Sequence, residues 1–106
     1  MGRHRRRRLR RKQFGGCRLE IYDRDDTFGI GRCMSFYVRR NELMRFDLFP
    51  GQEHWHRKAE TSQPRHYYPS GLAFHDYVEL ALKDLASDRR ITTNVIEWAR
   101  TELGRY

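Results

Sequence analysis

Two histidines and an aspartate with the potential for acid–base chemistry lie in the segment RFDLFPGQEHWHRK, residues 45–58. Polar and apolar residues alternate on both sides of its Pro-Gly dipeptide, which predicts a strand, a turn and a second strand. His54 and His56 are two residues apart, so on a strand their side chains point to the same face. Asp47, on the preceding strand, can share that face. A carboxylate beside two imidazoles and several cations indicates a site for phosphate chemistry.

Cleavage of RNA by its own 2′-hydroxyl needs a base, an acid and a cation that stabilises charge on the phosphate. Histidine titrates near neutral pH, so His54 and His56 are the candidate base and acid. Asp47 can fix the tautomer of either ring by a hydrogen bond. Arg45 and Lys58 alternate to the same face and are the candidate cations. These five residues form the predicted catalytic set, and neither a metal nor another cofactor is expected.

Two other interpretations stay open for these residues. Asp47, His54 and His56 form a set of two histidines and one carboxylate, which suits zinc or another transition metal. An outward pair of histidines on a polar sheet face is also common as a plain solvated surface. The residue types alone do not decide among acid–base catalysis, metal binding and a surface without function.

The elements that must position these residues follow from the period of the apolar pattern. Period-two alternation predicts four strands, at residues 17–22, 32–39, 43–49 and 53–59. Apolar residues at helical spacing predict an amphipathic helix over Phe74–Leu85 and a second over Thr93–Leu103. We therefore expect an α+β domain, a four-stranded antiparallel meander with two C-terminal helices packed on one face. The opposite face, with the histidines, is expected to be open.

The start of the chain is strongly basic. Residues 1–12 contain seven arginines, one lysine and no acidic residue, which equals the formal net charge of +8 for all 106 residues. Such a block is typical of a disordered arm that binds nucleic acid. We therefore expect a disordered arginine-rich tail over residues 1–16 and a single α+β domain over residues 17–106. The tail residues predicted to bind nucleic acid are Arg3, Arg5, Arg6, Arg7, Arg8, Arg10, Arg11 and Lys12.

Arg65 and Tyr67 add to the predicted nucleic-acid contacts, because cations hold phosphates and aromatic rings stack on bases. No apolar run approaches the roughly 18 residues of a membrane span, and no apolar stretch follows the basic start as in a secretory signal. Cys17 and Cys33 are too few for a disulfide framework. These features predict a cytoplasmic protein with reduced thiols, an RNA partner and no membrane partner.

The central motif resembles the TumE-type toxin components of bacterial and archaeal toxin–antitoxin pairs. In that family an aromatic-Asp-Asn segment is followed by a glycine four residues after the aspartate. One histidine follows three residues later and another two beyond it. Here Phe46-Asp47, Gly51, His54 and His56 match those spacings.

The likeness covers about residues 17–87, with Tyr67-Tyr68 and the helix of Phe74–Leu85 similar to downstream features of the family. Leu48 stands where the family usually has asparagine, and Trp55 stands where a basic residue is common. The resemblance implies a toxin that acts on RNA and is held in check by an antitoxin protein from a neighbouring gene. The alternative from another class is a non-catalytic accessory protein that binds nucleic acid through residues 1–12.

Overall fold

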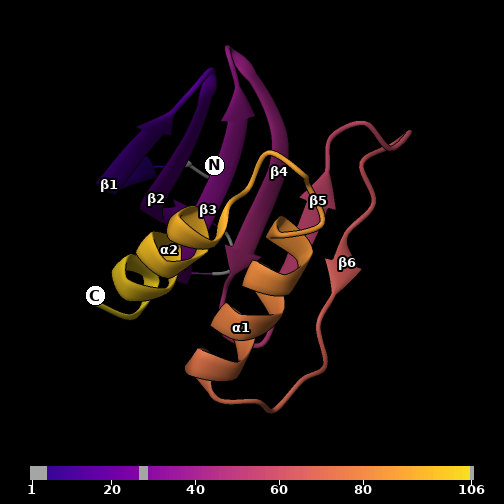
Figure 1. The fold of residues 1–106 in the computed structure, drawn as a ribbon. Helices are drawn as coiled ribbons and strands as arrows, with labels where there is room; N and C mark the ends of the chain where they lie inside the picture. The colour runs from indigo at the N-terminus through magenta and orange to yellow at the C-terminus, as the bar shows by residue number, and fades with distance from the viewer. Residues whose placement is uncertain (1–4, 27–28, 106) are drawn as a thin grey trace.

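A computed structural model describes residues 5–26 and 29–105, which form one antiparallel sheet followed by two helices. The strands are β1 (Arg5–Phe14), β2 (Cys17–Asp26), β3 (Gly29–Val38), β4 (Asn41–Leu48), β5 (His54–Arg57) and β6 (His66–Tyr67). Each strand pairs with its neighbour in the chain, in the order β1 to β6 (Figure 1). The helices are α1 (Phe74–Leu85) and α2 (Thr93–Arg105).

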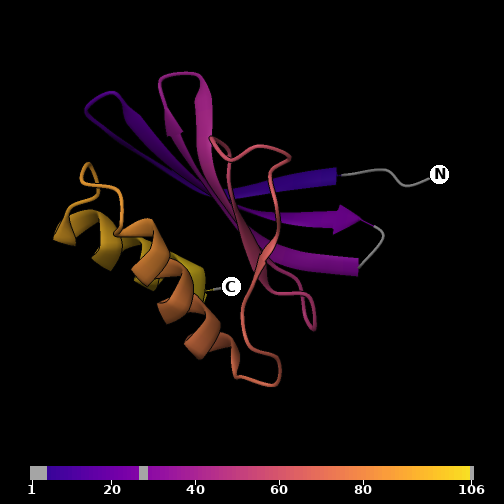
Figure 2. The same cartoon turned by 90° about the vertical axis from the view of Figure 1, so that its right-hand side faces the viewer.

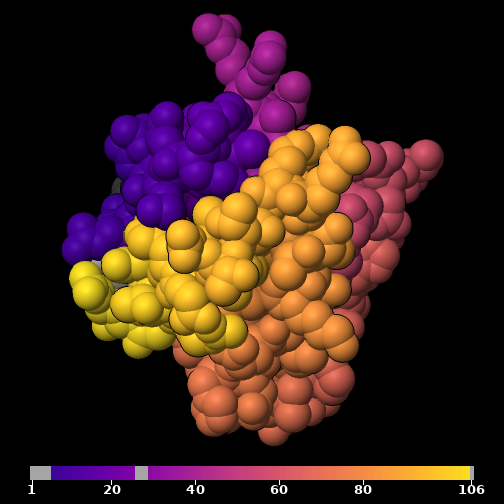
Figure 3. All heavy atoms as spheres, viewed as in Figure 1, coloured from indigo at the N-terminus to yellow at the C-terminus, as the bar shows by residue number. Residues whose placement is uncertain are grey.

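Both helices lie against the same face of the sheet (Figure 2). Seen from that side, α1 and α2 cover the middle of the sheet, with β1 beside them (Figure 3). Apolar side chains from β2 to β5 meet those of the helices in one core, which includes Leu19, Ile21, Met34, Phe36, Phe46, Val78 and Leu82. Neither helix in the described part of the chain is long and apolar enough to cross a membrane. The predicted α+β class, meander order and C-terminal helices are confirmed, but the sheet has six strands rather than four.

The arginine-rich segment forms the edge strand β1, so the expectation of a disordered tail is wrong for residues 5–14. Its hairpin with β2 turns at Gly15, whose φ of +55° is a left-handed conformation that glycine adopts without strain. The Phe14 ring stacks on Phe36 with centroids 6.2 Å apart, and Leu9 packs against the core. These two apolar anchors hold the basic strand on the sheet. Arg3 lies outside the described residues.

The stretch between β2 and β3 also differs from expectation. Residues 23–31 lie between two of the predicted strands, 17–22 and 32–39, but β2 continues to Asp26 and β3 begins at Gly29. Continued pairing of Arg24 with Gly31 extends the hairpin by several residues. The extension places Arg24 on the sheet face opposite the helices, because it keeps the alternation that starts at Tyr22.

Phe49 folds back over the sheet face opposite the helices. Its ring packs in a small buried cluster with Tyr22 and Cys33. A Cβ atom at Gly31 would contact the Phe49 ring and lie 2.9 Å from the Phe49 Cα atom. Only glycine allows this close approach of the chain after β4 to strand β3. One end of the open face is therefore covered by an aromatic side chain.

Gly31→Ala is expected to lower the free energy of unfolding by about 1–3 kcal/mol, because the added methyl group overpacks a filled site. The control is Gly16→Ala in the β1–β2 turn, where no atom lies within 4 Å of the new Cβ atom and φ is not positive. Urea denaturation of both variants checks the difference. Equal midpoints for Gly31→Ala and the parent would show that the Phe49 contact does not constrain the backbone.

Candidate active site

Strands β4 and β5 bring the three predicted site residues together. Asp47 pairs directly with His54, and Arg45 pairs with His56, so all four side chains lie on the face opposite the helices. Trp55 points to the other face and stacks on Phe46 with ring centroids 5.7 Å apart. The prediction that the aspartate and both histidines share one face, with Trp55 on the other, is confirmed.

These three side chains are buried, although the face was expected to be open. The exposed fraction is 1% for Asp47, 3% for His54 and 6% for His56. Phe49 covers one side, and the chain between β5 and β6 covers another, where the Gln63 carbonyl oxygen lies 3.1 Å from His56 Nδ1. The interpretation of the pair as a solvated surface is therefore wrong.

Backbone carbonyl groups fix the orientation of both imidazole rings. His54 Nδ1 lies 2.6 Å from the Gln52 carbonyl oxygen, and His56 Nδ1 makes the contact to Gln63. A carbonyl oxygen only accepts hydrogen bonds, so each Nδ1 carries the proton that it donates. In the neutral form of either ring, Nε2 then keeps a free lone pair. Both Nε2 atoms point toward Asp47.

One carboxylate oxygen is the centre of the cluster. Asp47 Oδ2 lies 3.0 Å from Arg45 Nε, 3.3 Å from His54 Nε2 and 3.5 Å from His56 Nε2. Burial alone would raise the pKa of Asp47, but the hydrogen bond from His54 and the charge of Arg45 outweigh it and lower that pKa to about 2. Asp47 is therefore ionised at neutral pH and compensates the cations around it.

The two histidines have different surroundings. Both nitrogens of His54 face acceptors, Gln52 and Asp47, which suits the protonated ring. His56 Nε2 is buried and has no hydrogen-bond partner among the described residues. Burial of His56 and the nearby charge of Arg45 lower its pKa below the ordinary value, despite the opposing hydrogen bond to Gln63. His54 is thus placed to give a proton and His56 to take one.

Three arginines line the small cavity that opens at these groups. Arg24, Arg45 and Arg65 surround a volume of about 70 Å³, with Phe49 and the Asp47–histidine cluster completing the wall. A single water needs only about 10–15 Å³ of such space, so the cavity has room for a group of several atoms. The positive charge of the three guanidinium groups is larger than the negative charge of the single carboxylate, so the cavity has a net positive charge. A phosphate group of an extended ligand fits both the size and the charge.

The remaining predicted residues are divided between the site and other parts of the surface. Lys58 does not line the cavity, and its amine lies 3.2 Å from Glu42 and donates to the Gln63 side chain, so its catalytic role stays a prediction without support from the cavity. Tyr67 is 56% exposed, and its ring centroid lies 5.3 Å from that of His54. Arg65, predicted only as a nucleic-acid contact, reaches the cavity itself.

The β1 residues divide between the two faces of the sheet. Arg6, Arg8 and Arg11 pair with Arg24, Tyr22 and Glu20 of the site face. The cations paired with helix-side residues of β2 are Arg7, Arg10 and Lys12. Arg10 contacts Glu102 of α2 at 3.3 Å. No side-chain position is described for Arg5.

The geometry also permits a metal ion. One ligand atom from each of Asp47, His54 and His56 lies within 4.8 Å of the others. Histidines that bind metals usually donate their second ring nitrogen to a carbonyl or carboxylate, as both rings do here. However, Arg45 bonds the Oδ2 atom of this carboxylate, which leaves only Oδ1 without a hydrogen-bond partner among the described residues, and two more arginines line the cavity. The donor set fits a divalent cation in type, but the surrounding charge opposes one.

Arg24 is the one cavity cation that the sequence reasoning missed. It lies in a stretch rich in aspartate and glycine, which favoured a loop. The signal that could have found it is the uninterrupted alternation of Arg18, Glu20, Tyr22 and Arg24 along β2. That alternation places Arg24 on the same face as the tyrosine.

Comparison of the chain with protein-family models, with curated proteins and with solved structures finds no match.

Proposed function

We propose that this protein is a metal-independent ribonuclease that cleaves RNA through the 2′-hydroxyl group. The observation that carries the proposal is the pair of buried histidines with unlike partners, next to a cavity of phosphate size lined by three arginines. His54 Nε2 lies 3.3 Å from the Asp47 carboxylate, whereas His56 Nε2, 3.5 Å from the same oxygen, is buried without a hydrogen-bond partner among the described residues. When the surroundings of two titratable groups differ in this way, one group is suited to act as an acid and the other as a base.

The steps follow from these positions. His56 Nε2 takes the proton of the 2′-hydroxyl, and the freed oxygen forms a bond to phosphorus. The bond from phosphorus to the 5′-oxygen breaks, and His54 gives its proton to that leaving oxygen. The products are a 2′,3′-cyclic phosphate and a 5′-hydroxyl group. Arg24, Arg45 and Arg65 stabilise the charge that develops on the phosphate oxygens.

Asp47 has a positioning role in this scheme. Its Oδ2 atom lies 3.3 Å from His54 Nε2, so it can accept the hydrogen bond of that ring and hold the ring in place. Arg45 bonds the same oxygen at 3.0 Å and keeps the carboxylate in place. The Asp47 carboxylate therefore holds both His54 and Arg45 in position.

A metal-dependent hydrolase that uses Asp47, His54 and His56 is the second candidate, because their ligand atoms converge. A chelator separates the two candidates. Cleavage of a single-stranded RNA by the purified protein is expected to continue in EDTA, and the same oligonucleotide with 2′-O-methyl groups is expected to remain intact. Loss of cleavage in EDTA that zinc or manganese restores would assign the residues to a metal site. Cleavage of the 2′-O-methyl analogue would contradict attack by the 2′-hydroxyl.

A toxin–antitoxin role is the biological context that the motif of Phe46-Asp47, Gly51, His54 and His56 supports. A ribonuclease of this kind would need an antitoxin protein to hold it in check. A purely accessory role through a basic tail has less support, because β1 is part of the sheet and three of its arginines face the histidines' side. A small helix-turn-helix protein in the neighbouring gene would favour the toxin role.

A further inference from the structure

We infer that a single-stranded RNA crosses the strands of the site face, from Tyr67 on β6 over the cavity to Arg6 and Arg8 on β1. The inference rests on the proposed function and adds the substrate class and its direction of binding. Register pairs form one continuous row across the sheet. The row runs Arg8, Tyr22, Cys33, Asp47, His54 and Tyr67. Its four middle side chains are buried, and Phe49 packs on Tyr22 and Cys33, so the RNA passes over the Phe49 ring and contacts the exposed ends of the row.

The length of the row sets the size of the ligand. Neighbouring strands lie about 4.8 Å apart, so five spacings from β1 to β6 span roughly 24 Å. The cavity at Asp47 and His54 holds one phosphate-sized group within this span. A ligand that fills the cavity and reaches both ends of the row must contain several nucleotides.

The two ends of the row offer different chemistry. At the β6 end, Tyr67 is more than half exposed and its ring lies against His54. An exposed ring beside a phosphate site is suited to stacking on a base, whatever its sequence. At the other end, Arg6 lies over the Tyr22 ring, 4.5 Å from its centroid, and pairs in register with Arg24 of the cavity. Arg6 and Arg24 therefore carry positive charge from the cavity to the β1 edge.

The charge of this face matches a polyanion. The arginines on the strands of the site face are Arg6, Arg8, Arg11, Arg18, Arg24 and Arg45. Among the side chains that the structure describes, the acidic residues there are Glu20, Glu42 and Asp47, each in contact with a cation. The Arg18 guanidinium also covers the Tyr37 ring at 4.3 Å, so a cation and an aromatic ring alternate here as well. A base-stacking strand with a phosphate backbone fits better than a duplex, whose bases are enclosed.

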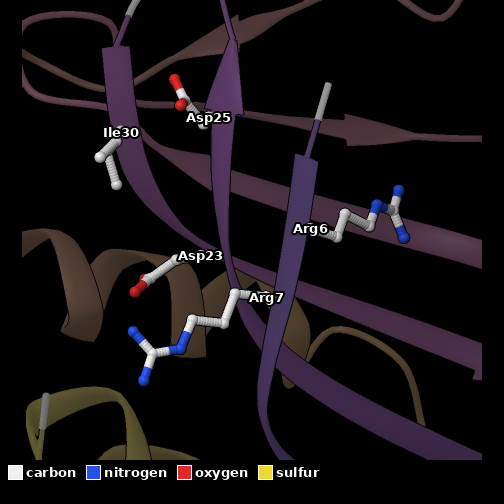
Figure 4. A pocket seen from close by; sticks show the side chains of 5 residues that line it. All are labelled: Arg6, Arg7, Asp23, Asp25 and Ile30. Carbon is white, nitrogen blue, oxygen red and sulfur yellow. The ribbon is translucent and has the colours of Figure 1, made fainter. Parts of the chain in front are cut away.

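Strand β1 itself provides a matched control. Arg6 and Arg7 leave β1 on opposite sides, with Arg7 pointing toward Asp23 (Figure 4). Asp23 belongs to the helix side, because it bonds Arg32, which in turn donates to the Leu103 carbonyl of α2. Arg7 and Lys12 thus carry the same charge on the same strand but face away from the proposed path.

The test compares two double variants that remove equal charge, Arg6→Ala with Arg8→Ala and Arg7→Ala with Lys12→Ala. Binding of a single-stranded 2′-O-methyl oligoribonucleotide is measured by fluorescence anisotropy at several salt concentrations. The site-face variant is expected to weaken binding about tenfold or more at about 0.15 M salt. Its log–log salt slope should fall by about 1.4, since two phosphate contacts are lost. The helix-side variant should change affinity about twofold or less.

Equal losses in the two variants, or no loss in the site-face variant, would overturn the path, as would equally tight binding of a duplex of the same length. Tyr67→Ala should raise the Kd for the same 2′-O-methyl oligonucleotide, and Tyr67→Phe should restore it, because stacking needs the ring and not the hydroxyl group. These binding results do not depend on cleavage. A parent that binds along this face but cleaves no RNA would contradict the proposed function and leave the path intact.

Discussion

Replacement of His56 by alanine is expected to lower the rate of RNA cleavage by roughly 10²- to 10⁴-fold, the usual contribution of a general base or acid. Replacement of His54 should cost a similar factor. The reason is geometric: the bare Nε2 atom of His56 and the carboxylate-facing Nε2 atom of His54 lie at the arginine-lined cavity. Single-turnover cleavage of a labelled RNA measures the loss. The control is His75→Ala, since the His75 side chain is 83% exposed on α1.

The pH profile tests the role of His56 as the base. A base acts only when neutral, so the rate of the parent should fall on the acid side as His56 gains a proton. Because burial and Arg45 lower the pKa of His56, that fall should occur below the ordinary histidine value of 6.5. His56→Ala should remove this acid limb.

Both histidines are buried, so each variant needs a folding check. Circular dichroism and a thermal melt should show a folded protein with a modest loss of stability. In cells, expression of the parent without an antitoxin should arrest growth, and neither histidine variant should do so. Folded variants that cleave RNA as fast as the parent would remove the histidines from the mechanism.

Replacement of Asp47 by alanine is expected to lower the free energy of unfolding by about 3–5 kcal/mol, the usual result of removing one partner of a buried ionic cluster. Arg45 and His54 would then lose their shared carboxylate in a site that is almost fully enclosed. Glu97→Ala is the control, because Glu97 also contacts an arginine, Arg100, but its side chain is 63% exposed. Such exposed pairs contribute about 0–1 kcal/mol. Equal losses in the two variants would contradict a stabilising role for the cluster.

The same carboxylate makes stability depend on pH. Its pKa falls from an ordinary value of 3.8 to about 2 on folding, which corresponds to roughly 2 kcal/mol. A lowered pKa means that the contribution is present above pH 4 or so and is lost as pH falls toward about 2. Urea denaturation of the parent and of Asp47→Asn across this pH range should show that the free energy of unfolding falls more steeply with decreasing pH for the parent.

The sequence predicts the site because alternation is strong in the strands that carry it. Phe46 and Trp55 have apolar neighbours at period two, so Asp47, His54 and His56 must point the other way. The two helices are predicted for the same reason, from the helical spacing of residues such as Tyr77, Ala81 and Leu85 in α1. In both cases one buried face determines the pattern.

Other features have no such local signal. In β1, arginines occupy positions on both faces, so charge dominates the pattern and only Leu9 and Phe14 reveal burial. The Gly15-Gly16 pair, at the end of the predicted disordered tail, is the turn of a hairpin. The enclosure of the histidines depends on Phe49, which follows its strand, and on the carbonyl group of Gln63. Contacts made by a folded-back side chain or by a backbone oxygen do not produce a periodic pattern of apolar residues in the sequence.

The edge strand β1 has a consequence for how the protein behaves at high concentration. An edge strand of ten residues that pairs only with β2 in the described part of the chain is a template on which a second copy can add its own strand. In such a pair the arginines of the two copies would face each other, and like charges opposite one another are destabilising. Repulsion along this edge should therefore keep copies apart in dilute salt. The Debye length shortens to about 3 Å at 1 M salt, so concentrated buffers weaken that protection.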